Sequence, residues 1–351
     1  MASAEAEIAA ERALLAEGGT GGDEALGGDV PTVDLAAGDE AAAAALWEAA
    51  TTVGFFQVVN HGIAQAEIDA AFSASAGFFA RPVEEKERAS PFAPEANSGY
   101  EFMKQVRPST GTADQKESLQ ITARQGAMEG RWPQEPPGLR GASERLLDSA
   151  LAVGRRILSL LETRACPKLA PGTLSRAHTL WGPQGQCTLR MLHYFPMELR
   201  ALEALRADGG GRMHWRAGPH TDWCCATLLF QRPGGDGLEC APNPRVGGPW
   251  LRVPPQEGAI AVNIGDMLGR WSDGRLLSNL HRVRLPTPAE CSPARPRYSI
   301  AVFLQADRDA EIRSEKHPTI TAGDYILGRI RSNFASGPAP KRQKVAADAA
   351  A

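Results

Sequence analysis

The sequence predicts a mainly β fold with flanking helices (α+β), in which short strands build an antiparallel sandwich or barrel. From about residue 188 to residue 305, short apolar or alternating stretches are separated by Gly, Pro and Asp, a pattern typical of strands and turns. Helical patterns precede this region at about 39–50, 64–80 and 142–165, and another follows at about 321–333. The strand-rich part is therefore the expected core, and the helices are expected to pack around it.

Size and composition restrict the class of protein. The chain has 351 residues, 43% of them hydrophobic, which is enough for a substantial core. Its formal charge of −3 makes a nucleic-acid partner unexpected, because no overall positive charge is present to attract phosphates. No apolar stretch approaches the roughly 20 residues that span a bilayer, and the first residues do not resemble a signal peptide. We expect no membrane partner and a cytoplasmic location, with six scattered cysteines as free thiols.

Four segments follow one another along the chain. Residues 1–28 form an Ala-, Glu- and Gly-rich leader that we expect to be disordered, and residues 29–180 form an N-terminal region of strands and helices. This region opens with two strands, in VPTVDL and GFFQVVNHGI, and the polar, Pro-rich stretch between its last two helices is expected to wrap the surface. Residues 181–333 form the strand-rich core with its C-terminal helix, and residues 334–351 a flexible basic tail.

The tail carries a short basic cluster. Lys341, Arg342 and Lys344 lie in the Pro-flanked stretch PAPKRQKV. An extended basic segment of this kind fits the acidic groove of a nuclear import receptor, and it equally fits a solvated tail that keeps the C-terminus soluble. Nuclear location thus stands beside the cytoplasmic expectation as an alternative.

Candidate metal ligands stand out in GPHTDW. On a strand, alternate side chains share a face, so His220 and Asp222 point the same way. A second histidine on another strand would complete a site of two histidines and one carboxylate, which holds Fe(II) and leaves three positions open for oxygen chemistry. His281, in SNLHRVRL, is the candidate. Alone, an H-x-D tripeptide is common by chance.

A second pair follows His281 by sixteen residues. Arg297 and Ser299 share a face of the next strand, and an arginine fork beside a hydroxyl fits one end of a dicarboxylate. We expect this strand to lie in the same sheet as the metal-binding strand. The alternative is an ordinary surface arginine beside a strand serine.

Together, these motifs resemble the isopenicillin N synthase-like group of iron(II)- and 2-oxoglutarate-dependent oxygenases over residues 30–333. The blocks occur in the order of that family, which makes the set far more specific than any single motif. They are VPTVDL, GFFQVVNHGI, DQKESLQI, LRMLHYFP, AGPHTDWCCATLLFQ, GDGLEC, WLRVPP, AVNIGDML, RWSDGRLLSNLHRV and RYSIAVF.

This resemblance implies a double-stranded β-helix, or distorted jelly roll, with iron in its mouth. It implies that His220, Asp222 and His281 bind Fe(II), and that Arg297 and Ser299 bind the distal carboxylate of 2-oxoglutarate. Tyr194 matches a tyrosine that assists there, although its context, His-Tyr-Phe-Pro, departs from the family's usual Asn-x-Tyr. The expected cofactor and cosubstrates are Fe(II), 2-oxoglutarate and O2, with ascorbate as an additional candidate. The expected activity couples oxidative decarboxylation of 2-oxoglutarate to oxidation, usually hydroxylation, of a small organic substrate.

Two other functions stay open for a chain with these motifs. One is a 2-oxoglutarate-independent Fe(II) oxidase of the same fold, and the other is a catalytically inactive jelly-roll binding protein. Of the remaining histidines, His61 matches a structural position of the family, and His178 and His317 are expected to be exposed beside Pro- and Gly-rich segments. His193 is placed with equal weight in the pocket or outside it.

Overall fold

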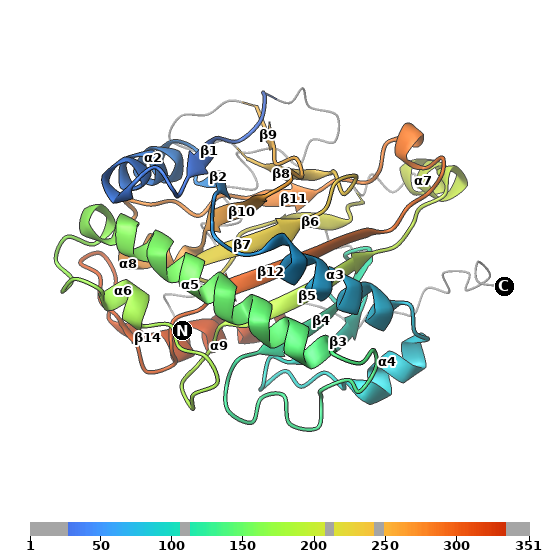
Figure 1. Cartoon of the computed structure of the whole chain (residues 1–351), viewed down its shortest axis with the longest axis horizontal. Coiled ribbons are helices and arrows are strands. Elements are labelled where there is room, and N and C mark those ends of the chain that lie inside the picture. Colours follow the sequence, from blue (N-terminus) through green and yellow to red (C-terminus); the bar gives the residue numbers. More distant parts are fainter. Residues whose placement is uncertain (1–26, 106–112, 208–213, 242–248, 335–351) are drawn as a thin grey trace.

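Two facing sheets form the centre of the molecule (Figure 1). The computed structural model describes residues 27–105, 113–207, 214–241 and 249–334. An eight-stranded sheet has the order β1-β2-β10-β7-β12-β5-β4-β3, and a four-stranded sheet has the order β6-β11-β8-β9. All neighbouring strands are antiparallel except β1 and β2. The predicted mainly β jelly-roll core with flanking helices is confirmed.

Both predicted regions contribute to the large sheet. Strands β1 to β4 come from residues 29–180, and the other four come from residues 181–333. The strands of the large sheet are β1 Thr32–Asp34, β2 Phe55–Val59, β3 Gly99–Phe102, β4 Lys116–Thr122, β5 Thr188–Tyr194, β7 Ala226–Gln231, β10 Ala259–Ile264 and β12 Arg297–Leu304. Those of the small sheet are β6 Ala217–His220, β8 Leu238–Cys240, β9 Leu251–Arg252 and β11 His281–Val283, and a separate pair is β13 Glu311–Ile312 with β14 Ile320–Thr321.

Helices cover the outer face of the large sheet, where the long helix α5 crosses its strands (Figure 1). The four helices expected from the sequence are all present, with ends shifted by a few residues at most. The helices are α2 Asp39–Thr52, α3 Gln65–Phe79, α4 Val83–Ala89, α5 Leu139–Ala165, α6 Thr173–Arg176, α7 Leu199–Ala207, α8 Asp266–Trp271 and α9 Ala322–Phe334, with a short 3₁₀ helix at Pro288–Glu290.

Alternation along the strands separates the two faces of the large sheet. On β12, Ile300, Val302 and Leu304 pack into the core beneath the helices, whereas the residues between them face the small sheet. Helix α5 approaches this strand closely because Gly154 faces Leu304: a Cβ at Gly154 would lie 2.3 Å from Leu304 Cδ1. The sheet therefore buries one face under helices and leaves the other to line a cavity.

The stretch between α3 and α5 corrects a prediction. It was expected to wrap the surface, but it contains α4 and the strands β3 and β4, and every residue of β4 is buried. Charged residues in β4 hide it from a hydrophobicity pattern. The structure neutralises them in pairs: Lys116 Nζ lies 2.8 Å from Asp114 Oδ2, and Glu117 Oε2 lies 2.7 Å from Lys86 Nζ.

The expected exposure of His178 is also wrong. This side chain is fully buried, and its Nδ1 lies 2.8 Å from the carbonyl oxygen of Leu174. Burial lowers the pKa of His178 to about 4. His317 is half-buried. All six cysteines are buried and carry free thiols.

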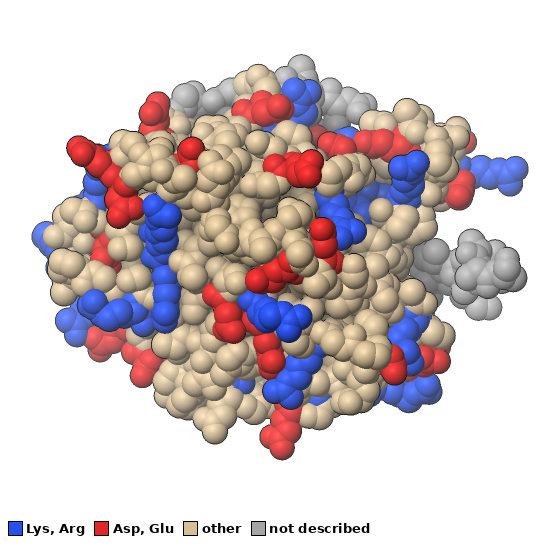
Figure 2. Space-filling model, in the orientation of Figure 1, with Lys and Arg blue, Asp and Glu red and all other residues tan. Residues whose placement is uncertain are grey.

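Surface properties add few constraints. Figure 2 shows acidic and basic side chains interspersed over one face, so that face presents no continuous basic stripe for phosphates. Among the residues described, none of the helices is both long and apolar enough to traverse a bilayer. The predicted leader, apart from Gly27 and Gly28, and the tail cluster Lys341, Arg342 and Lys344 lie outside the described residues.

Candidate active site

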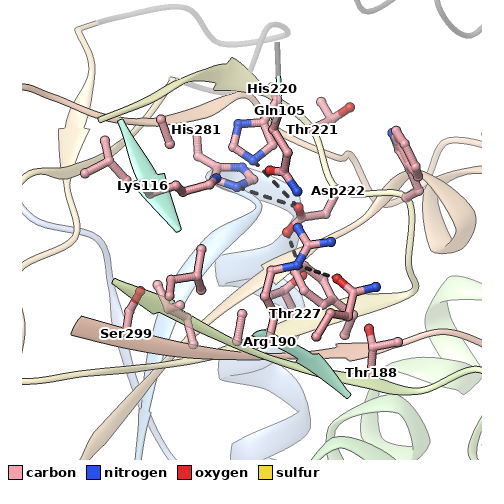
Figure 3. A pocket seen from close by; sticks show the side chains of 18 of the residues that line it. Gln105, Lys116, Thr188, Arg190, His220, Thr221, Asp222, Thr227, His281 and Ser299 are labelled. Carbon is pink, nitrogen blue, oxygen red and sulfur yellow. Dashed lines mark hydrogen bonds and ion pairs between the residues drawn. The ribbon is translucent and has the colours of Figure 1, made fainter. Parts of the chain in front are cut away.

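A cavity of about 560 Å³ lies between the two sheets. Its floor is the inner face of the large sheet, where strand register arranges the side chains in successive rows (Figure 3). The rows are Lys116 with Tyr194 and Arg297, then Leu192 with Ser299, then Gln120 with Arg190 and Ala301, and last Thr188 with Phe303 and Thr227. Successive rows are about 6.6 Å apart, because each step spans two strand residues.

The three predicted metal ligands come together opposite this floor. His220 ends β6 and is the register partner of His281 on β11, and their ring centroids are 4.2 Å apart. Asp222 Oδ1 lies 4.0 Å from His220 Nε2 and 3.8 Å from His281 Nε2. One potential ligand atom from each residue falls within a 4.8 Å cluster. Two imidazoles and one carboxylate in this arrangement are a donor set that suits a single Fe(II) ion.

Backbone carbonyls orient both imidazoles. His220 Nδ1 lies 2.7 Å from the Gly218 oxygen, and His281 Nδ1 lies 3.5 Å from the Asn279 oxygen. A carbonyl can only accept, so each Nδ1 carries the proton and each Nε2 presents its lone pair towards Asp222. Both rings are thus in the tautomer that metal ligation through Nε2 requires.

Two donors that the sequence analysis missed hold the other oxygen of Asp222. Thr227 Oγ1 donates to Asp222 Oδ2 at 2.6 Å, and Asn263 Nδ2 donates to it at 2.9 Å. Thr227 and Asn263 are register partners on β7 and β10. With Oδ2 engaged, Oδ1 is the atom directed at the histidines. Nothing in the local sequence marks these residues, because the pairing of two distant strands creates the contact.

The C-terminal helix is linked to the same strand end. Asp266 accepts hydrogen bonds from Thr221 Oγ1 at 3.0 Å and from Arg329 of α9 at 2.6 Å, and its own backbone nitrogen donates to the Asp222 carbonyl at 2.7 Å. Helix α9 also supplies Ile326 and Ile330 to the cavity wall. The position of α9 is therefore fixed relative to the cluster of His220, Asp222 and His281.

Arg297 occupies the far end of the floor and is 2% exposed. Its guanidinium donates to the Gly235 carbonyl at 2.7 Å, to Gln231 Oε1 at 2.9 Å and to Ser299 Oγ at 3.3 Å. Its Cζ lies 4.8 Å from the ring centroid of Tyr194, the register partner of Arg297. Burial lowers the pKa of Arg297, while the neighbouring Tyr194 raises it. An arginine remains protonated even so, which keeps a cation at this end.

Lys116 is a further cation that the sequence analysis missed at this end. It lies opposite Tyr194 in the sheet register and lines the cavity. Asp114, which pairs with Lys116, also accepts from the backbone nitrogen of Gly218 at 3.0 Å. This carboxylate therefore ties β4 to the strand that carries His220.

Strand placement differs from the prediction in one respect. Arg297 and the metal-binding strands were expected in one sheet, but β12 belongs to the large sheet and β6 and β11 belong to the small one. The two groups therefore face each other across the cavity. His193, which was placed with equal weight inside or outside the pocket, points to the helix side, where it stacks on Tyr298 at 4.7 Å and meets Glu117 Oε1 at 2.7 Å.

A jelly roll with two histidines and an aspartate lining a cavity that also holds a buried arginine has the architecture of a non-haem metal-dependent oxygenase. Comparisons with known proteins agree with this class. The model described as the non-haem dioxygenase N-terminal region in morphine synthesis matches residues 30–138, and the model of the 2OG-Fe(II) oxygenase superfamily matches residues 189–306.

Individual relatives cover most of the chain. The 2-oxoglutarate-Fe(II) type oxidoreductase hxnY of Emericella nidulans is 30% identical, over 83% of this chain and 84% of its own. Validamycin A dioxygenase of Streptomyces hygroscopicus subsp. limoneus is 29% identical, over 86% and 85%. A full-length Neurospora crassa protein, solved in complex with alpha-KG, superposes with a TM-score of 0.71 at 26% identity, over 86% of this chain and 96% of that one.

The chain belongs to the 2OG-Fe(II) oxygenase superfamily. It is an Fe(II)- and 2-oxoglutarate-dependent dioxygenase that uses O2 and acts on a small-molecule substrate.

Proposed function

We propose that His220, Asp222 and His281 bind the Fe(II), and that Arg297, Ser299 and Tyr194 bind the distal carboxylate of 2-oxoglutarate. The observation that carries this proposal is the cluster of one carboxylate and two correctly oriented imidazoles facing a buried arginine across one cavity. A dicarboxylate that reaches from the metal to Arg297 would cross the floor between them. The arginine fork and the Ser299 hydroxyl then bind its far end.

When bound, Fe(II) and 2-oxoglutarate supply the activation of O2 and the oxidising equivalent that attacks the substrate. The protein contributes position and environment. Thr227 and Asn263 hold Asp222 so that one oxygen faces the metal position. Leu192, Leu229 and Val283 line the cavity with apolar surface, which limits water near the reacting atoms. We propose hydroxylation of a C–H bond as the outcome.

The names of the relatives support a small organic substrate and do not favour a single one. One relative is a validamycin A dioxygenase, and the similar Neurospora crassa protein has also been solved in complex with thymine. A cavity of about 560 Å³ is in the range for compact ligands of this size.

Anaerobic binding followed by turnover tests the proposed roles. Fe(II) and then 2-oxoglutarate are titrated into the wild-type protein and into the variants Asp222→Ala and Arg297→Leu. We expect Asp222→Ala to lose Fe(II) binding, and Arg297→Leu to bind Fe(II) normally and 2-oxoglutarate weakly. In a second arm, a metabolite extract is screened for succinate formed from added 2-oxoglutarate. Normal binding of both ligands by both variants would refute the assigned roles.

For the tail, we propose that Lys341, Arg342 and Lys344 bind a nuclear import receptor and give the enzyme a nuclear pool beside the cytoplasmic one. The support is the basic, Pro-flanked sequence alone. The test is a fluorescent fusion of residues 334–351, compared with the same fusion carrying alanine at the three basic positions. Nuclear enrichment of the first fusion only is expected, and equal distribution of both would exclude an import signal.

A further inference from the structure

We propose that Arg190 binds a carboxylate of the organic substrate, so that the substrate is a small carboxylic acid with an apolar body. This inference deepens the proposed function and rests on it. Arg190 lies on β5, between Gln120 of β4 and Ala301 of β12, and lines the cavity. In Figure 3 it rises from the floor, on the side opposite His220 and His281.

Arg190 and Arg297 occupy different parts of the floor. Arg297 is the register partner of Tyr194, which is four residues from Arg190 along β5, a separation of about 13 Å in an extended strand. In the proposed complex, one end of 2-oxoglutarate is at the metal and the other is at Arg297. Both carboxylates of the cosubstrate are therefore placed away from Arg190. Lys116 lies in the Arg297 row and is paired with Asp114, so Arg190 is a cation placed to bind the other reactant.

A chain of contacts orients the Arg190 side chain. Gln120 Nε2 donates to the Asn97 carbonyl at 2.7 Å, which turns Gln120 Oε1 towards β5, where it accepts from Arg190 Nε. The guanidinium carbon lies 5.3 Å from the ring centroid of Phe303. One edge of the guanidinium is thus fixed on Gln120 and its plane packs near an aromatic ring. An arginine oriented in this way needs little further ordering to bind a planar anion.

The other side chains that line the cavity indicate the polarity of the rest of the substrate. The same cavity is lined by neutral polar groups from Thr188 and Gln305 and by the apolar or aromatic side chains of Trp223, Ile326 and Ile330. Guanidinium pairs most strongly with a planar carboxylate, through two parallel charge-assisted hydrogen bonds. An apolar substrate body would pack against the α9 wall, close to the metal position. Together these features favour a carboxylic acid whose remaining atoms are largely apolar.

The test compares acids with their neutral amides. Protein loaded anaerobically with Fe(II) and saturating 2-oxoglutarate is titrated calorimetrically with phenylacetate, hexanoate and 4-hydroxybenzoate, and with the corresponding primary amides. The variants are Arg190→Gln, which removes the charge, and Arg190→Lys, which keeps the charge but loses the fork. Arg295→Gln is the matched control, because Arg295 is exposed just before β12. Fe(II) and 2-oxoglutarate affinities are measured for every variant.

We expect at least one acid to bind the wild type about ten-fold more tightly than its amide. Arg190→Gln should remove that preference, Arg190→Lys should restore part of it, and Arg295→Gln should leave it intact. The inference is overturned if no acid is preferred over its amide, if Arg190→Gln retains the preference, or if the acids compete with 2-oxoglutarate. Loss of Fe(II) or 2-oxoglutarate binding in the wild type would instead refute the proposed function, so the two failures are distinguishable.

Discussion

Arg190 and Arg297 lie on the same face of the large sheet but differ in burial and in hydrogen-bond partners. Arg297 is almost fully buried, and it is held by a backbone carbonyl, a glutamine and a serine. Arg190 is half-buried, and its side-chain contacts include Gln120 and the ring of Phe303. The first side chain is enclosed by protein, whereas the second is partly exposed in a cavity that helix α9 also lines.

This difference fits the two ligands proposed for the sites. A cosubstrate shared by a whole family needs one unchanging geometry, which strand-to-strand contacts provide. A substrate differs from one family member to the next, and side chains at loops and helix ends can change without disturbing the sheet. Variants of the proposed metal cluster, of the Arg297 end and of the surrounding fold should therefore differ in which binding or stability they lose.

The largest effect is expected at the metal cluster, on which both ends of the cavity depend. His220→Ala, Asp222→Ala and His281→Ala each remove one of three proposed ligands, so Fe(II) binding and all 2-oxoglutarate turnover should be lost. Calorimetric Fe(II) titration measures the first effect and succinate formation the second. Circular dichroism should match the wild type. Unchanged iron binding in all three variants would show that the ligands are elsewhere.

The next effect isolates the Arg297 end. Arg297→Leu removes a charge-assisted fork worth about 1.5–3 kcal/mol, so the KM for 2-oxoglutarate should rise by about ten- to a hundred-fold while Fe(II) affinity stays the same. Steady-state kinetics and metal titration measure the two quantities. Arg295→Leu, on the exposed segment just before β12, is the control and should change neither. A larger effect from Arg295→Leu would contradict the assignment.

A smaller effect is expected where the sheet supports the proposed ligand Asp222. Thr227→Val keeps the side-chain shape but removes the donor to Asp222 Oδ2, so Fe(II) affinity should fall about ten-fold. Thr188→Val is a matched control on the same row, because its hydroxyl makes no hydrogen bond within the described structure. Fe(II) titration of both variants measures the effect. Equal Fe(II) affinities would mean that the Thr227 contact does not orient the Asp222 carboxylate.

The smallest effect on Fe(II) binding and on 2-oxoglutarate binding is expected from His178, which does not line the cavity. Its pKa is lowered to about 4 by burial, whereas an unfolded histidine titrates near 6.5. As pH falls from 6.5 towards 4, the histidine is protonated in the unfolded state but stays neutral in the folded state. The free energy of unfolding therefore falls by up to about 3 kcal/mol.

Denaturant unfolding of the wild type and His178→Gln at pH 7 and pH 4.5 measures this loss. The variant should lose less stability than the wild type on acidification, and at pH 7 both proteins should have the same KM for 2-oxoglutarate. An identical loss in both proteins would show that His178 titrates normally.

Local sequence was sufficient to predict several residues that the structure brings into one cavity. His220 and Asp222 are predicted because two residue types of metal-ligand chemistry stand two positions apart, and Arg297 with Ser299 because the same spacing repeats on a later strand. His281 was selected as the second histidine that would complete the ligand set, and the ordered family motifs supported that choice. These features depend on residue type, spacing and chain order, which a sequence contains in full.

Other features were decided only by the tertiary structure. Strand β4 was not predicted because Lys116 and Glu117 hide its burial, and only the fold shows that Asp114 and Lys86 neutralise them. Thr227 and Asn263 became supports of Asp222, and Arg190 became a cavity residue, through the register of distant strands. The mainly β class, the helices and the donor chemistry of the proposed ligand set follow from local periodicity and residue type, both of which a sequence contains. Which strands faced each other across the cavity depended on long-range pairing, and that has no local signature.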